Sequence, residues 1–266
     1  MLRLITVFLF IPFAALAATP AELSRLHTAL QTNALMDILS EEGLEQAEEL
    51  RDEMFPGRGG VGWTATVREI YAPDRLAELF RGAFDAALQE EEVRPLLQFY
   101  DSDVGARVAA LEVEARRAIM SEEVEAAAKN AYRDIAGSGS EREALLEEFA
   151  TLNDLIDRNV AGALNANLAF YRGLGSNGDF EMTEDDMLRD VWGQEAAIRD
   201  DTIEWIFGYM TSAYTTLSDE ELQAYVDMTA TDAGRNLNRA LFAGFDAIFL
   251  DVSYALGAAT GLFSIG

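Results

Sequence analysis

The amino-acid sequence predicts an all-α protein in which tandem, pseudo-symmetric helical repeats form an antiparallel helical bundle. Three observations favour this fold: apolar residues recur at helical spacing, capping residues precede several of these stretches, and the sequence matches itself after a shift of 129 residues. No segment alternates convincingly between polar and apolar residues, so we expect little or no sheet.

The first residues have the pattern of a secretory signal. Arg3 precedes an apolar run over residues 4–16, and Ala15-Leu16-Ala17 matches the small-x-small pattern of signal-peptidase sites. The run is shorter than the roughly 20 residues that a membrane-spanning helix needs. We therefore predict a signal peptide at residues 1–17 and an exported protein that is periplasmic and soluble after cleavage.

The acidic composition disfavours some classes of binding partner. The 266 residues include 47 Asp and Glu against 20 Lys and Arg, which gives a net charge of −27. Like-charge repulsion disfavours nucleic acid and anionic lipid as partners. Cys is absent, so an exported chain of this length must gain its stability from its core. No later transmembrane segment is expected, and the uncharged stretch 252–266 is interpreted as a packed final helix, with a peripheral membrane contact as the alternative.

The repeat divides the chain into a first unit at residues 18–137 and a second at 138–266. Trp63 falls on Trp192 after the shift of 129 residues, without gaps. The other matches are Leu88 with Leu217, Glu91-Glu92 with Glu220-Glu221, Asp103 with Asp232, Gly105 with Gly234, Ile119 with Ile248, and Leu23, Leu26, Leu35 and Leu39 with Leu152, Leu155, Leu164 and Leu168. The segment 136–140 between the units has the composition of a flexible linker.

Each unit has its own sequence of predicted helices. In the first unit, Thr19-Pro20-Ala21-Glu22 predicts a capped helix start, and Ser40-Glu41-Glu42 predicts the cap of the next segment. An apolar stripe follows over residues 76–88, and a shifted stripe over 203–217 is widened by Trp205 and Tyr209. Ser218 then predicts the cap of the helix after that second stripe.

The most distinctive string occurs once in each unit. Residues 98–105 read Gln-Phe-Tyr-Asp-Ser-Asp-Val-Gly, and residues 227–234 read Asp-Met-Thr-Ala-Thr-Asp-Ala-Gly. We expect a corner between two helices, in which a hydroxyl caps the second helix, an aspartate lies in its first turn, and glycine allows the close approach of a helix or an aromatic ring. The residues of this structural corner are Phe99, Tyr100, Ser102, Asp103, Gly105, Thr231, Asp232 and Gly234.

The Phe-Tyr-x-Ser-x-x-Gly string at 99–105 resembles the bacterial domain-of-unknown-function family 2059. The resemblance covers residues 75–119 and recurs over 204–248, with Met228-Thr229 in place of Phe-Tyr. It implies an exported helical protein, and it brings no catalytic residues because no activity is established for that family. Asp103 and Val104 stand where members of the family often have a proline-containing step.

The residue types of the usual catalytic and metal sites are scarce. His27 is the only histidine, which with the absence of Cys excludes the usual zinc and iron–sulfur ligand sets. The glycine-rich stretch 57–62 lacks the strand and the Gly-Lys-Ser/Thr of a phosphate loop and is interpreted as a connector. Most acidic clusters stand at helix starts, where capping explains them, and only the group around Asp179, Glu181, Glu184 and Asp185 suggests weak cation binding. We therefore predict no catalytic, metal-binding or cofactor-binding residues and no cofactor.

Trp63 and Trp192 are the candidate contacts for a partner, with packing of the core or between the repeats as the simpler interpretation. The favoured function is a non-enzymatic binding or interaction module whose partner is a protein or small ligand of the envelope. The alternatives are a hydrolase of envelope glycans with paired carboxylates about 5–10 Å apart, and a carrier that holds an apolar ligand between the repeats.

Overall fold

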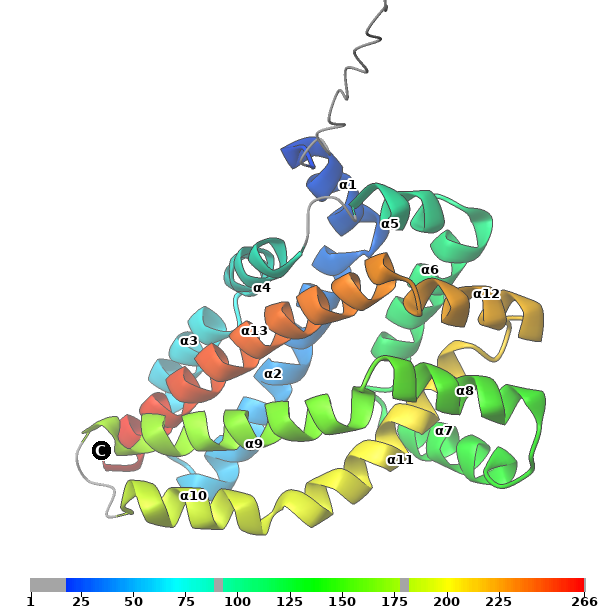
Figure 1. Cartoon of the computed structure of the whole chain (residues 1–266). Coiled ribbons are helices and arrows are strands. Elements are labelled where there is room, and N and C mark those ends of the chain that lie inside the picture. Colours follow the sequence, from blue (N-terminus) through cyan, green and yellow to red (C-terminus); the bar gives the residue numbers. More distant parts are fainter. Residues whose placement is uncertain (1–17, 89–92, 178–181, 266) are drawn as a thin grey trace, which may run out of the picture.

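The computed structural model describes residues 18–88, 93–177 and 182–265, all of which form helices and the turns between them (Figure 1). The predicted all-α fold is confirmed. The predicted signal peptide at 1–17 lies outside the described residues, as do Glu90-Glu91-Glu92, Asp179 and Glu181.

The described residues of 18–137 form seven helices, and those of 138–265 form six α-helices and one 3₁₀ turn. The first seven are α1 (Pro20–Ala29), α2 (Thr32–Met54), α3 (Gly60–Ile70), α4 (Pro73–Ala87), α5 (Val93–Tyr100), α6 (Asp103–Ala118) and α7 (Glu122–Ile135). The remainder are α8 (Glu141–Leu152), α9 (Leu155–Leu174), the 3₁₀ turn η2 (Gly175–Asn177), α10 (Glu184–Gly193), α11 (Glu195–Ala213), α12 (Asp219–Thr229) and α13 (Asp232–Ile265). We call residues 18–137 the first half and residues 138–265 the second half.

Side-chain caps account for several helix starts. Thr19 and Ser218 form capping boxes with Glu22 and Glu221, in which hydroxyl and carboxylate satisfy free backbone amides at the start of α1 and α12. The predicted cap at Ser40 is wrong, because Ser40 is buried inside the continuous helix α2. A hydroxyl inside a helix can be accommodated where neighbours cover it, so the Ser-Glu-Glu pattern alone does not mark a helix start.

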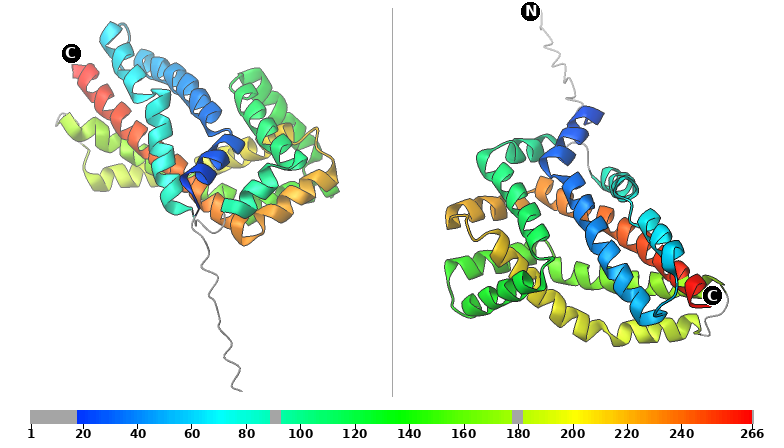
Figure 2. Two further views of the ribbon diagram at one scale, coloured as in Figure 1. Left: turned by 90° about the horizontal axis from the view of Figure 1, so that it is seen from above. Right: turned by 180° about the vertical axis from the view of Figure 1, so that it is seen from behind.

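The last helix of each half packs against the other half. In Figures 1 and 2, α13 lies between α9 of its own half and the α3–α4 pair of the first half, and it packs against both. In the reciprocal position, α7 of the first half packs against α11 of the second. One hydrophobic core therefore combines residues of α1–α6 with Leu237, Ile248 and Val252 of α13. A second core combines α8, α11 and α12 with Val108 and Ala115 of α6. Each half completes the core of the other.

Helix α13 is a single helix of 34 residues, so residues 252–265 of the predicted final helix are the end of a longer element. Residues 232–264 are long and apolar enough to cross a membrane, with a mean hydropathy of 1.4 over their most apolar window, although the sequence led us to expect no such segment. One third of that window is buried in the protein. The buried side chains, among them Ile248, Val252 and Ala259, belong to the core shared with the first half, whereas other large apolar side chains of the same helix are exposed, namely Phe249, Leu250, Tyr254 and Leu262.

The gapless shift of 129 residues does not hold at the start of the halves. It pairs Leu26, inside α1, with Leu155, the first residue of α9. The structure instead has two matching turns 123 residues apart, at Gln31 before α2 and Asp154 before α9. These residues have left-handed backbone angles of φ 53°, ψ 35° and φ 52°, ψ 37°, respectively. The upstream leucine matches therefore do not occupy equivalent places in the helices.

The corner strings have the same hydrogen bonds in both halves. In the first, the Ser102 hydroxyl donates to the carbonyl of Phe99 at 2.6 Å and accepts from the Gly105 amide at 3.2 Å. In the second, the Thr231 hydroxyl donates to the carbonyl of Met228 at 2.6 Å and accepts from the amide of the corresponding glycine at 3.0 Å. Each hydroxyl thus links the end of one helix to the start of the next.

Glycine is required at these corners because the preceding helix ends against it. A Cβ atom on Gly105 would lie 2.2 Å from the carbonyl oxygen of Phe99, and one on Gly234 would lie 2.3 Å from that of Met228. The close neighbour is therefore the backbone of the preceding helix, and no aromatic ring is involved. Backbone cannot yield as a flexible side chain can, so any larger residue must open the corner.

We expect Gly105→Ala and Gly234→Ala each to lower the free energy of unfolding by about 1–3 kcal/mol, because the added methyl group forces the corner apart. Gly82→Ala is the matched control, since a Cβ atom there meets nothing within 4 Å, and it should stabilise α4 by about 0.5–1 kcal/mol. Urea denaturation monitored by circular dichroism measures all three. Equal effects at Gly82 and at the corners would contradict this explanation.

A candidate binding cavity between the halves

A cavity of about 370 Å³ lies where the two halves meet. This volume falls in the range of pockets that hold small molecules, roughly 300–1,000 Å³. Its wall comes from α2, α5 and α6 of the first half and from α8, α9, α11, α12 and α13 of the second. Most of the wall is apolar and includes Leu35, Leu39, Val113, Phe149, Leu155, Ile206, Met210, Leu241, Phe242 and Phe245.

A carboxyl group stands in this apolar surrounding. Glu112 of α6 lines the cavity, and its Oε1 accepts hydrogen bonds from the hydroxyls of Tyr214 at 2.7 Å and Tyr225 at 3.0 Å. The hydroxyl of Tyr209 donates to the backbone carbonyl of Glu112 at 2.9 Å. Glu112 belongs to the first half and all three tyrosines to the second, so this cluster joins the halves across the cavity.

The surroundings of Glu112 favour its neutral form. Burial raises the pKa of the Glu112 carboxyl above its ordinary value of 4.5, while the hydrogen bonds from Tyr214 and Tyr225 act in the opposite direction. Burial, and next the neighbouring Glu112 carboxylate, raise the pKa of Tyr209, Tyr214 and Tyr225 well above 10.0. The three tyrosines therefore remain hydrogen-bond donors at neutral pH.

The second charged residue of the wall already has a partner. Arg116 follows Glu112 by one helical turn and forms an ion pair with Glu42 of α2, which does not line the cavity. The guanidinium also lies over the ring of Trp205, 5.7 Å from its centroid, and Trp205 stacks on Tyr209 with the planes 3° apart. Of the described residues that line the cavity, Glu112 is the only carboxylate.

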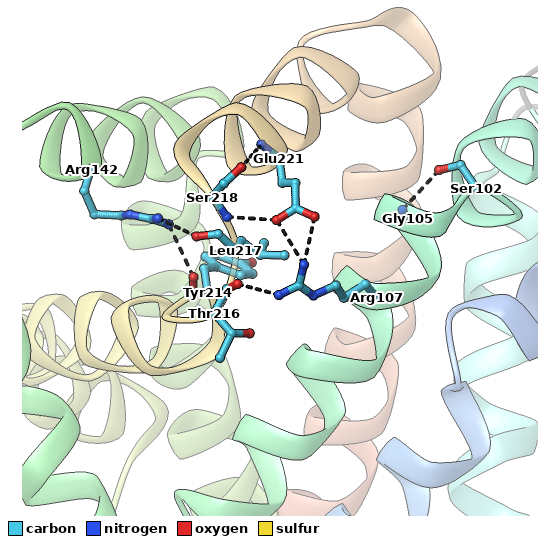
Figure 3. A network of polar contacts seen from close by, with 9 residues as sticks. All are labelled: Ser102, Gly105, Arg107, Arg142, Tyr214, Thr216, Leu217, Ser218 and Glu221. Atoms are coloured by element: carbon cyan, nitrogen blue, oxygen red, sulfur yellow. Dashed lines mark hydrogen bonds and ion pairs between the residues drawn. The ribbon is translucent and has the colours of Figure 1, made fainter.

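The turn between α11 and α12 positions the tyrosines. Figure 3 shows Arg107 of α6 in a two-pronged ion pair with Glu221, at 2.8 and 3.0 Å, while its other nitrogen bonds to the carbonyl of Thr216. From the other side, Arg142 of α8 donates to the carbonyls of Tyr214 at 3.3 Å and Leu217 at 2.6 Å. Both arginines hold the turn that orients Tyr214 toward Glu112 and that opens α12, the helix of Tyr225.

The two predicted tryptophan contacts lie elsewhere and in different environments. Trp63 is fully buried in α3 against Phe55 and Phe263, with ring centroids 5.0 and 5.7 Å away. Trp192 is 65% exposed near the end of α10. Neither lines the cavity. Two aromatic side chains from the widened stripe of α11, Trp205 and Tyr209, line it instead.

The corner residues contribute to the cavity although the sequence suggested only a structural role. Tyr100 and Gly234 line the wall, and the ring of Phe99 stacks on Tyr225 with centroids 5.8 Å apart. Ser102, Asp103, Thr231 and Asp232 stay at the helix starts. Sequence reasoning missed Glu112, whose signal was its spacing: it stands four residues after the buried Val108 and three before the buried Ala115, on the inward face of α6.

The other polar features do not form a comparable site. His27 is buried, and its Nε2 lies 2.9 Å from a carboxylate oxygen of Asp85. A groove between α2 and α4 is lined by the exposed carboxylates of Asp37, Asp74, Glu78 and Asp85. Within residues 18–88, 93–177 and 182–265, no three histidine or acidic side chains are grouped as a metal would require.

Residues 74–134 match the family whose description is "Uncharacterized protein conserved in bacteria (DUF2059)". This match supports the family expected from the sequence. It spans α4 to α7 and includes the first corner, Glu112 and Arg116. No curated protein and no solved structure matches the chain.

The raised pKa of Glu112 has a consequence for stability. Its folded-state pKa lies above the unfolded value near 4.5, so ionisation of Glu112 lowers the free energy of unfolding. This destabilisation is absent below pH 4.5. It grows as the pH rises toward the folded-state pKa and is complete above that pKa. Glu112→Gln keeps an oxygen acceptor for the tyrosines and removes the charge. We expect this variant to be more stable than the parent at about pH 7, with the difference closing below about pH 4.5.

Urea denaturation of both proteins across this pH range measures the difference. Glu114→Gln, on the exposed side of the same helix, is the control and should change stability little at any pH. A difference between Glu112→Gln and the parent that widens on acidification would show that the carboxylate is stabilised in the folded protein.

Proposed function

We propose that this protein is a non-enzymatic binding protein that holds a small, mainly apolar molecule in the cavity between its halves. The observation that carries the proposal is the cavity itself, which combines an apolar and aromatic wall with one cluster of polar groups around Glu112. Binding sites for small molecules have this composition, since apolar surface provides affinity and a few polar groups fix orientation.

The arrangement of carboxylates favours binding over glycan hydrolysis. A hydrolase with paired carboxylates needs two of them across one site, with one kept protonated by its surroundings. Glu112 has such surroundings, but it is the only carboxylate among the described residues of the cavity wall. The acids of the groove between α2 and α4 are exposed to solvent and do not stand in an enclosed, apolar site.

We also propose a cellular compartment for the protein and an evolutionary origin for the cavity. The signal-like residues 1–17 support export to the periplasm, where an acidic chain without cysteine would act as a soluble carrier. The same hydrogen bonds at the corners of Ser102 and Thr231 support a second copy of the family domain in the second half. The matching turns at Gln31 and Asp154 extend the similarity of the halves beyond the residues that match the family. A duplicated unit whose last helices each pack against the opposite half creates a junction at which such a cavity can form.

The neutral dye N-phenyl-1-naphthylamine, whose fluorescence rises in apolar surroundings, tests the cavity. We expect the parent protein to bind it, and Val113→Trp to weaken binding at least tenfold because the larger side chain fills the space next to Glu112. Val61→Trp is the matched control, since Val61 is 88% exposed on α3 and does not line the cavity; this variant should bind as the parent does.

Circular dichroism and thermal denaturation establish that both variants are folded. Equal loss of binding in both variants, or unchanged binding in Val113→Trp, would place the dye outside the cavity. Absence of binding to the parent protein at micromolar concentrations would overturn the proposed function.

A further inference from the structure

We propose that the natural ligand of the cavity carries a positively charged nitrogen on an apolar body, and that Glu112 and the aromatic rings around it receive that nitrogen. This inference rests on the proposed function and adds the chemical class of the ligand to it.

The carboxyl of Glu112 lacks a partner of opposite charge. The hydrogen bonds to its side chain come from Tyr214 and Tyr225, which are neutral donors, and both go to Oε1. Among the described ion pairs, none involves Glu112. A carboxyl group in apolar surroundings is costly to ionise alone, and a cation beside it offsets that cost. A ligand with a charged nitrogen would supply the missing cation.

The rings beside Glu112 suit a cation as well. Tyr214 and Tyr225 have ring centroids 6.0 Å apart, and Phe149 lies 6.0 and 5.0 Å from them, so that three rings form one cluster next to the carboxyl. Phe149 and both tyrosines line the cavity. The negative face of an aromatic ring attracts an ammonium group within about 6 Å, so rings that border the cavity beside the carboxyl favour a cation over an anion there.

Arg116 does not take this role. Its guanidinium is committed to Glu42 of α2 and to the face of Trp205, and the described structure gives it no ion pair with Glu112 although the two residues are one turn apart. An anionic head group would find Arg116 already neutralised and would meet the Glu112 carboxyl. The net charge of −27 adds long-range repulsion of anions.

Three probes with the same twelve-carbon chain separate the head groups: dodecylamine, dodecanol and dodecanoate. Each is titrated, below its micellar concentration and at neutral pH, against the complex of the parent protein with N-phenyl-1-naphthylamine. We expect dodecylamine to displace the dye at a concentration at least tenfold lower than dodecanol, and dodecanoate to be the weakest. Glu112→Gln should remove the advantage of the amine over dodecanol, whereas Glu114→Gln should keep it.

The outcomes distinguish this inference from the proposed function. Equal displacement by all three probes, or preference for dodecanoate, would overturn the inference about charge while the cavity continues to bind apolar molecules. Failure of the parent to bind the dye or any probe would overturn the proposed function. The ranking on the unmodified protein decides the charge of the ligand even if a variant is unstable, and a preference for amine that persists in Glu112→Gln would exclude Glu112 as its receptor.

Discussion

The contact on which the rest of this structure depends is the one between the Glu112 carboxyl of α6 and the hydroxyls of Tyr214, at the end of α11, and Tyr225 of α12. It brings a titratable group from the first half into an apolar space whose other wall belongs to the second half. Burial raises the pKa of that group, so its presence works against stability at neutral pH. Groups placed at such a cost are characteristic of functional sites, which is why the cavity is the centre of the proposed function.

The last helix of each half, α7 and α13, packs against the other half. Because α13 packs against α4 and α9 while α7 packs against α11, neither half encloses a complete core without the other. The junction is therefore a permanent part of the fold, and its wall is assembled from helices far apart in the sequence. Arg107 and Arg142 fix the turn that carries the tyrosines, so the position of the donors is set by ion pairs and carbonyl contacts outside the cavity.

Local features of the fold could be predicted from the sequence, and contacts between the halves could not. The helical spacing and the caps at Thr19 and Ser218 depend on neighbouring residues, so they were visible without a structure. Trp63 and Trp192 share a position in the shifted sequence but not an environment: α13 covers the first through Phe263, and the second is largely exposed. Glu112 was hidden because the tyrosines that surround it lie about a hundred residues away.

The charge state of Glu112 tests the account most directly. Carbon-13 nuclear magnetic resonance of the protein labelled at its glutamate carboxyl carbons can follow each group through a pH titration, and the Glu112→Gln variant assigns the signal that belongs to Glu112. The account predicts that this signal titrates clearly above pH 4.5, and that adding an amine probe shifts its midpoint downward as the cation favours the ionised form. A midpoint at or below 4.5 without any ligand would mean that the carboxyl is solvated, and it would contradict the apolar surroundings assigned to it.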